Sequence, residues 1–166
     1  MNEPNPYAPP KARVADVDAA AGELAGRWER LGAALLDGLI GLVWGLPLAY
    51  AFGVFNSLGA AAALATQKRL ELGIIGFVAF ALVHGYFLNA NGQTIGKKIV
   101  GMRIAMLDGS VPPLWRTLGL RYLPVTLVQL IPTVGGLLGL IDILLIFRDN
   151  RRCAHDLIAG TKVVKV

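Results

Sequence analysis

The sequence predicts an all-α polytopic membrane protein with about four transmembrane or re-entrant helices and a small cytoplasmic two-stranded sheet. The first observation behind this class is composition, since 55% of the 166 residues are hydrophobic and only 16% are charged. Ordinary soluble domains carry more charge and fewer apolar residues. The second is distribution, because the apolar residues gather at residues 30–55, 72–90 and 114–147. The third is a strand-like segment between the last two stretches, which predicts the sheet.

The stretch at residues 30–55 predicts the first transmembrane helix. Its apolar residues, rising about 1.5 Å each, are numerous enough to cross a hydrocarbon core of about 30 Å. Asp37 lies about two turns inside this stretch. Because a charge in lipid costs several kcal/mol, its side chain is expected to face protein or water. Arg30 lies nearly on the same helix face and is the expected partner. The pair either has a structural role, fixing the depth and rotation of the helix, or forms an ion or proton site.

The stretch at residues 72–90 predicts a second transmembrane helix that is just long enough to span the membrane. The linker before it, at residues 56–71, either continues as helix or forms a short loop. His84 lies in the last third of the second helix. We expect a buried neutral histidine with a hydrogen-bond partner rather than a proton relay.

The third stretch, residues 114–147, is too long for one straight span and too short for two full spans with a loop. Pro124, Pro132 and the pair Gly135-Gly136 interrupt it. We therefore predict two short helices, roughly residues 115–131 and 134–147, that form a tight or re-entrant hairpin. Broken helices at membrane depth are tolerated where they line protein or a cavity.

The polar segment after the second helix contains a predicted strand at residues 99–107, followed by an Asp-Gly turn. Two prolines at residues 112–113 prevent a long returning strand. The unpaired strand edge needs a partner. The carboxyl-terminal residues 160–166, GTKVVKV, are β-branched and apolar, and we predict that they pair with the first strand through Arg103.

Basic residues predict the orientation, because positively charged loops stay in the cytoplasm. The amino terminus, the polar loop and the carboxyl tail are therefore expected on the cytoplasmic side. Lys68 and Arg69 do not fit this rule, because they lie in the loop that this topology places on the other side. Residues 1–26 contain no signal-peptide pattern and are expected to form a flexible cytoplasmic tail. Lys97 and Lys98 are expected to contact anionic lipid headgroups, worth about 1 kcal/mol each.

Under this topology, charged side chains converge near the cytoplasmic face. Asp37, Arg121 and Asp142 each lie about 7 to 10 Å into the membrane from the same side, counted at about 1.5 Å per residue. Arg30 lies at the boundary. If the two arginines and two aspartates are fully paired, the layer is structural. If one aspartate is left in excess, it could accept a proton or a small cation.

Composition and motifs exclude several functions. The formal charge of +5 is explained by basic residues at the ends of apolar segments, so nucleic-acid binding is not expected. One cysteine and two histidines without ligand spacing predict no metal site. No nucleophile motif accompanies His155-Asp156, and GQTIGKK lacks the phosphate-loop spacing because Lys98 occupies the Ser/Thr position. We therefore expect neither an enzyme nor a bound cofactor.

Three motifs occur in an order that resembles one known family. They are Arg30-x-x-Ala33-x-x-x-Asp37, then GQTIGKK with VGxRI at residues 92–104, then RRxxHDxxAGTxVV at residues 151–164. The chain resembles the RDD family, named for one arginine and two aspartates, over about residues 27–166. Arg30 and Asp37 match the first two letters, and Asp156 is assigned to the third, with Asp142 as a competing candidate. The resemblance implies a multi-pass protein of the bacterial inner membrane.

The resemblance implies function only loosely, since the family has been proposed to transport unidentified ligands and some relatives to exchange sodium for protons. One hypothesis is therefore transport or exchange of a monovalent cation or proton through the Arg/Asp cluster. With so few helices, such a protein is expected to form a homo-oligomer. The alternative is a non-transporting scaffold or regulatory protein that docks a membrane or cytoplasmic partner and whose charge cluster is structural. The sequence alone leaves both open.

Overall fold

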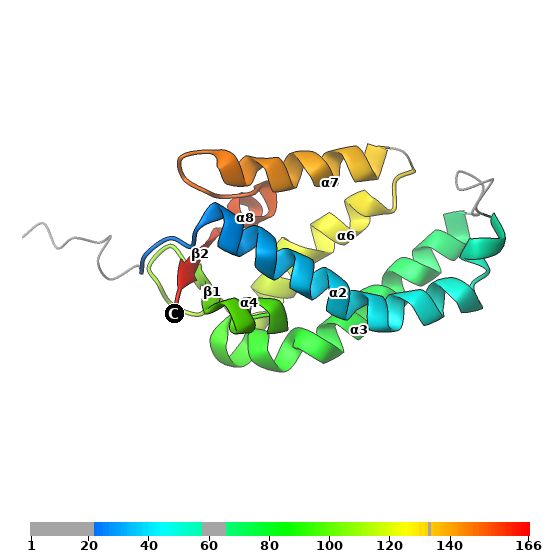
Figure 1. The fold of residues 1–166 in the computed structure, drawn as a ribbon, viewed down its shortest axis with the longest axis horizontal. Helices are drawn as coiled ribbons and strands as arrows, with labels where there is room; N and C mark the ends of the chain where they lie inside the picture. The colour runs from blue at the N-terminus through cyan, green and yellow to red at the C-terminus, as the bar shows by residue number, and fades with distance from the viewer. Residues whose placement is uncertain (1–21, 58–65, 133) are drawn as a thin grey trace, which may run out of the picture.

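A computed structural model of the chain describes residues 22–57, 66–132 and 134–166. Most of the tail expected at residues 1–26 lies outside these ranges, as does the middle of the linker at residues 56–71. Two long helices dominate the rest, α2 (Arg27–Ala51) and α3 (Thr66–Asn91). Helix α2 leads away from the end of the molecule that carries the sheet, passes into a short 3₁₀ turn, η1 (Val54–Ser57), and α3 returns toward that end (Figure 1).

Both long helices have the length and surface of membrane spans. Among the described residues, α2 and α3 are the two helices long and apolar enough to cross a membrane, with 25 and 26 residues and mean hydropathies of 1.7 and 1.8. Large apolar side chains such as Val43 and Leu82 are 74% and 79% exposed. Because extended apolar surfaces of this kind are unstable in water, they are the surface that lipid would cover.

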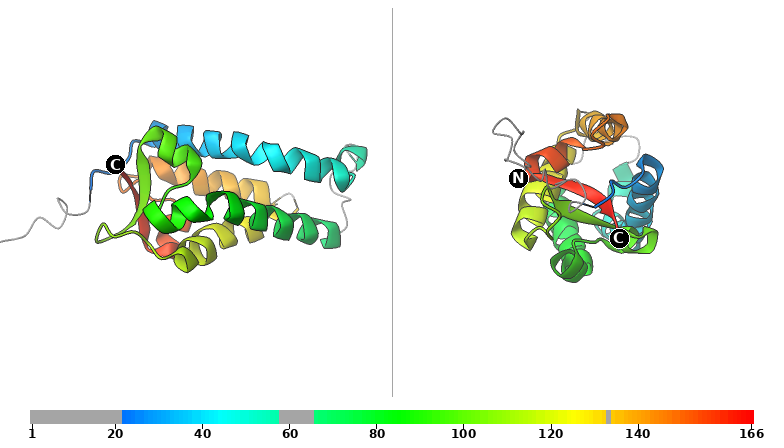
Figure 2. Two further views of the ribbon diagram at one scale, coloured as in Figure 1. Left: turned by 90° about the horizontal axis from the view of Figure 1, so that it is seen from below. Right: turned by 90° about the vertical axis from the view of Figure 1, so that its left-hand side faces the viewer.

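The third apolar stretch forms the predicted helical hairpin. Its first arm joins α5 (Leu114–Arg116), the π-helix η2 (Thr117–Tyr122) and α6 (Leu123–Gln129). The second arm is α7 (Val134–Leu144), followed by the 3₁₀ turn η3 (Leu145–Phe147). The hairpin stops short of the far ends of α2 and α3 (Figures 1 and 2).

The hairpin is the shorter part of the expected set of about four transmembrane or re-entrant helices. At about 1.5 Å per residue, the 11 residues of α7 are too short for a core of about 30 Å. The described residues therefore contain two helices of membrane length beside a short hairpin, and four transmembrane helices are not confirmed. Gly135 explains how closely the two arms pack, because a β-carbon there would collide with the backbone of Val128 and Gln129.

The predicted pairing of the two strands is confirmed, and the structure adds their direction. Strand β1 (Met102–Met106) pairs antiparallel with β2 (Thr161–Lys165), and Arg103 lies opposite Val164. On the other side of β2, the Ala25 amide donates to the Val163 carbonyl at 3.0 Å, next to a bridge between Leu24 and Val164. The residues that lead into α2 thus border the strand that ends the chain.

The predicted start of the first strand, at Ile99, is wrong. Residues Ile95–Val100 form the short helix α4, which packs against α2. Thr94 caps its first turn, with its side chain accepting from the Lys97 amide, and Gly101 ends it with a φ of +76°. These are the usual start and stop signals of a helix, so the strand begins only at Met102.

Helix α4, the two strands and helix α8 (Ala154–Ala159) gather at one end of the molecule, which we call the sheet end (Figure 1). The small buried core lies here and is formed by residues from α2 and the segment just before it, from α3 and from both strands. Its members are Ala25, Ala33, Leu88, Met102, Ile104 and Val163. Beyond the sheet end, the helices expose most of their apolar side chains, so the tightly packed part of the chain is where the charged side chains also meet.

Candidate functional site

Asp156 lies at the centre of the buried charge cluster. Its carboxylate is fully buried, at 0% exposure, near the start of α8. Oδ2 accepts from Arg30 Nη2 at 2.5 Å, and Oδ1 accepts from Arg121 Nη1. The Cys153 amide also donates to Oδ2, at 3.1 Å. One carboxylate therefore joins the first long helix, the π-helix of the hairpin and the carboxyl-terminal tail.

The two arginines are buried along with Asp156 and have further partners. Arg30 is 7% exposed and Arg121 is 2% exposed. Arg30 Nη1 donates to the Arg151 carbonyl, and Arg121 Nη1 donates to Thr161 Oγ1 at 2.8 Å. A buried ion is tolerated only when it is paired and its remaining hydrogen-bonding groups are largely satisfied. Arg30 and Arg121 are both paired with Asp156, and most of the remaining hydrogen-bonding groups of these three residues have partners.

The cluster fixes the charge state of the groups around it. Burial alone would raise the pKa of Asp156, but Arg121 and Arg30 hold the pKa of its carboxyl well below the ordinary value. Asp156 is therefore ionised at neutral pH. Burial raises the pKa of the Cys153 thiol to about 11. Because the thiolate is the reactive form of cysteine, Cys153 is inert at neutral pH.

His155 connects the cluster to Asp142 on α7. His155 Nδ1 lies 2.5 Å from Asp142 Oδ2, and the His155 amide donates to Asp142 Oδ1 at 3.1 Å. The other ring nitrogen, Nε2, lies 3.3 Å from Arg121 Nη2. Since a guanidinium can only donate, Nε2 accepts and the proton lies on Nδ1. The neutral ring thus donates to Asp142 and accepts from Arg121.

Asp37 belongs to a separate cluster between α2 and α4. Thr94 Oγ1 donates to its Oδ2 at 2.5 Å, and the Gly96 amide donates to Oδ1 at 2.7 Å. Lys97 Nζ lies 3.4 Å from Oδ2. The expected pair of Asp37 with Arg30 is therefore wrong, because the GQTIGKK segment folds against α2 and supplies Asp37 with partners of its own.

His84 lies beside this second cluster. Its side chain is fully buried, and Nδ1 accepts from the Ile95 amide at 3.2 Å. Its ring centroid lies 4.7 Å from that of Phe80. Within the described part of the chain, Nε2 has no hydrogen-bond partner. The structure therefore places His84 as a buried residue that holds the start of α4, in line with the first of the two readings of this histidine.

The single layer of four charges expected from the sequence is replaced by two clusters. Asp156 takes the place that Asp37 was expected to fill beside Arg30, and Arg121 contacts Asp156 as well. Asp142 instead pairs with His155. The sequence argument counted depth along each helix, so it could not place a tail residue among the helices. Thr94 and Lys97 lie in the second of the three quoted motifs and His155 lies in the third, so these motifs were the available signal.

The charge state of His155 predicts how stability depends on pH. Burial and then Arg121 lower the pKa of His155 below its ordinary value, so the unfolded chain takes up this proton at a higher pH than the folded one. Stability from this residue is complete above about pH 6.5 and declines as the pH falls below it. We expect the Tm in detergent to drop by a few degrees between pH 7 and pH 5.

The variant His155→Asn tests this assignment, because its amide keeps a donor toward Asp142 but does not titrate. Melting curves from pH 7 to pH 5 should be flatter for the variant than for the wild type. Equal slopes for the two proteins would show that His155 is not the titrating group.

One group of side chains has the composition of a metal site. The candidate donor atoms of Cys153, His155 and Asp156 all lie within 4.8 Å of one another. All three donors are already hydrogen-bonded to arginines, and the thiol is neutral at physiological pH. A cation placed there would lie against the Arg30 and Arg121 guanidinium groups. The arrangement therefore does not fit a metal ion.

Fold and cluster together define a small helical membrane protein whose motifs meet around buried arginines and aspartates. The sequence model of the RDD family matches residues 24–160, and the chain belongs to that family. It is 34% identical over 139 residues to the uncharacterized protein YckC of Bacillus subtilis (strain 168), covering 84% of this chain and 83% of the relative. An uncharacterized protein of Haemophilus influenzae is 27% identical over 145 residues, covering 85% and 78%. No solved structure matches the chain.

Proposed function

We propose that the protein is a membrane scaffold or regulatory partner protein that does not transport solutes and whose Arg/Asp cluster is structural. The observation that carries this proposal is the fully buried Asp156, which is bonded to Arg30, Arg121 and the Cys153 amide. A carboxylate that exchanges an ion needs access to water and a free coordination site. Asp156 has neither, and it fastens three separate parts of the chain to one another.

The scaffold would present the sheet end to the cytoplasm, in a multi-pass protein of the bacterial inner membrane with both termini on the cytoplasmic side. Basic residues concentrate in this end and its loops, which supports that orientation. They are Arg27, Lys97, Lys98, Arg103, Arg116, Arg148, Arg151, Arg152, Lys162 and Lys165. Lys98 Nζ lies 4.4 Å from the Phe87 ring centroid. Lysines placed beside apolar side chains in this way are suited to anionic lipid headgroups, and a protein partner would dock on the same face.

The proposal predicts that Asp37→Asn chiefly lowers stability. The exchange removes the negative charge and replaces Oδ2, which accepts from Thr94 and Lys97, with a donor, while Oδ1 can still accept from the Gly96 amide. Since a hydrogen bond to a charged group is worth about 1.5–3 kcal/mol, we expect a clear loss of Tm in detergent. Cation-dependent proton flux in proteoliposomes should be absent from both the wild type and the variant. A pull-down through the sheet end should recover a partner protein. An unchanged Tm, or a flux that Asp37→Asn abolishes, would contradict the proposal.

A second candidate function is exchange of a monovalent cation or proton, and one observation favours it. Asp142 and His155 are only partly buried, with side chains 15% and 19% exposed, and both line an open cavity. Because a single chain offers few helices for a route, this function would require a homo-oligomer. Proton flux that depends on a monovalent cation, and that Asp142→Asn abolishes without a loss of Tm, would favour exchange over the scaffold.

A further inference from the structure

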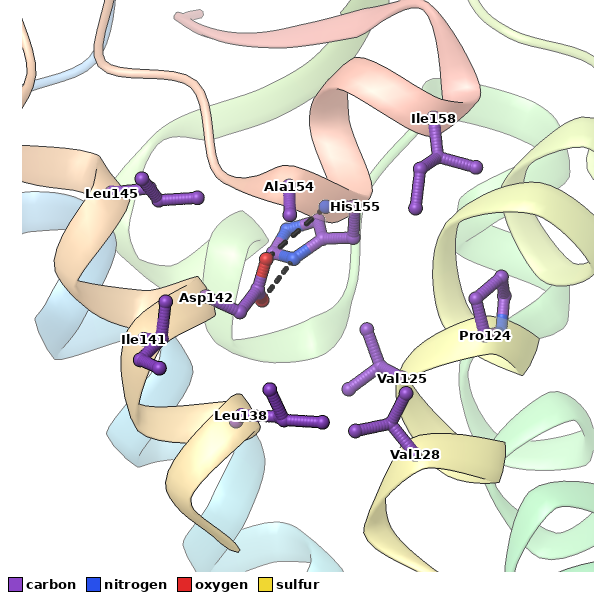
Figure 3. Close-up of a pocket in the computed structure, with 11 residues that line it drawn as sticks. Pro124, Val125, Val128, Leu138, Ile141, Asp142, Leu145, Ala154, His155 and Ile158 are labelled. Atoms are coloured by element: carbon purple, nitrogen blue, oxygen red, sulfur yellow. Dashed lines mark hydrogen bonds and ion pairs between the residues drawn. The ribbon is translucent and has the colours of Figure 1, made fainter. Parts of the chain in front are cut away.

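A cavity of about 230 Å³ lies between α6, α7 and α8 (Figure 3). Its walls are almost entirely apolar, and Figure 3 shows Asp142 and His155 at the end nearest α8. The lining side chains that matter here come in pairs from the three helices. They are Val125 and Val128 from α6, Leu138 and Asp142 from α7, and His155 and Ile158 from α8. A concave apolar site with a few polar groups at one end is the usual form of a small-molecule site.

The polar end of the cavity accepts hydrogen bonds and does not donate them. His155 gives its Nδ1 proton to Asp142 and uses Nε2 to accept from Arg121, so its ring has no donor left. Each Asp142 oxygen accepts one bond from His155. The Ala154 amide also acts on this carboxylate. Because a carboxylate offers about four acceptor positions, at least one remains for a ligand. Arg121, the cation that contacts His155, is already engaged by Asp156 and Thr161.

Charge and size together select the class of ligand. The free acceptors belong to an aspartate, so they favour a positively charged donor and disfavour a carboxylate or phosphate. At about 30 Å³ per water-sized group, the volume holds roughly eight such groups. This is below the range of about 300–1,000 Å³ for drug-sized ligands. The occupant is therefore a single short alkyl chain rather than a whole lipid.

We propose that this cavity binds a lipophilic amine, with its alkyl chain between α6 and α7 and its ammonium group on Asp142. Such a molecule would enter from the bilayer, where Leu138 and Ile141 of α7 both line the cavity and are exposed. The inference goes beyond the scaffold function and does not depend on it. It gives the protein a site at which a small amphiphile acts directly on the segment that holds the cluster.

The experiment uses the full chain in lipid nanodiscs at pH 7.5, with radiolabelled octylammonium as the probe and equilibrium dialysis against empty nanodiscs. We expect saturable binding in excess of partition into lipid. A charge-assisted hydrogen bond should make octylammonium bind about tenfold or more tightly than octanol. Octanoate should not compete.

Three variants separate the parts of this site. Asp142→Asn should reduce the affinity for octylammonium to that for octanol, whereas Asp149→Asn, in the exposed turn after η3, should leave it unchanged. Val125→Trp should fill the cavity and abolish binding of both probes. This third variant keeps the pair of Asp142 and His155 intact, so it remains informative if Asp142→Asn does not fold.

Several outcomes would overturn the proposal. Binding no greater than to empty nanodiscs would remove the site. Equal affinity for octylammonium and octanol would remove the role of Asp142, and preferential binding of octanoate would reverse the assigned charge. Full binding by a folded Val125→Trp protein would place the ligand elsewhere. None of these outcomes bears on whether the cluster around Asp156 is structural.

Discussion

Replacing Asp156 by asparagine is expected to lower the free energy of unfolding by about 3–5 kcal/mol, the usual cost of removing one partner from a buried ion pair. The substitution leaves Arg30 and Arg121 as two buried cations without a counter-ion. Asparagine is nearly the same size as aspartate, so the loss would report charge rather than packing. Reversible unfolding in mixed detergent micelles, followed by circular dichroism, measures it.

The matched control is Asp149→Asn, which removes a carboxylate from an exposed turn and should change stability by less than about 0.5 kcal/mol. A triple replacement, Asp156→Leu with Arg30→Met and Arg121→Met, should be less harmful than Asp156→Asn alone, because no buried charge is then left unpaired. Equal stability of Asp156→Asn and the wild type would show that the cluster does not hold the sheet end together.

Gly96→Ala is expected to destabilise the protein by about 1–3 kcal/mol or more, the range for forcing atoms into a packed site. A β-carbon at Gly96 would collide with the Ala33 carbonyl oxygen and with the Asp37 carboxylate. Helix α4 would have to move away from α2, which breaks the bond from the Gly96 amide to Asp37. The Tm in detergent measures this effect.

Gly38→Ala provides the control, because Gly38 lies in α2 with open space where its β-carbon would be. Alanine has a higher helix propensity than glycine by about 1 kcal/mol, so this variant should be as stable as the wild type or more stable. If the two glycine variants have the same Tm, Gly96 is not needed for the close approach of α4 to α2.

The long elements of the fold could be predicted from the sequence, since apolar runs of sufficient length leave few alternatives. The hairpin and the pairing of β1 with β2 were also predictable, from proline and glycine positions and from an unpaired strand. Helix α4 was missed because Ile99 and Val100 are β-branched and resemble the start of a strand. Thr94 and Gly101 carried the opposite signal, and the local caps outweighed the propensity of two residues.

The site was predictable in its members but not in its contacts. Five of the six expected residues lie in the two clusters, and the sixth, His84, lies beside one of them. Partners were inferred from spacing within the first helix and from depth along the others, and neither measure places a residue of the carboxyl-terminal tail. The bond between Arg30 and Asp156 spans 126 residues, and no periodic pattern in the chain encodes such a contact.

This separation sets an order of events during synthesis. Arg30 leaves the ribosome 126 residues before Asp156, a delay of about 6 to 25 s at common bacterial elongation rates. Throughout that interval, the first long helix carries an arginine whose counter-ion has not yet been made. Final docking of that helix therefore awaits translation of α8, and a nascent chain that stops short of Asp156 cannot reach the native arrangement.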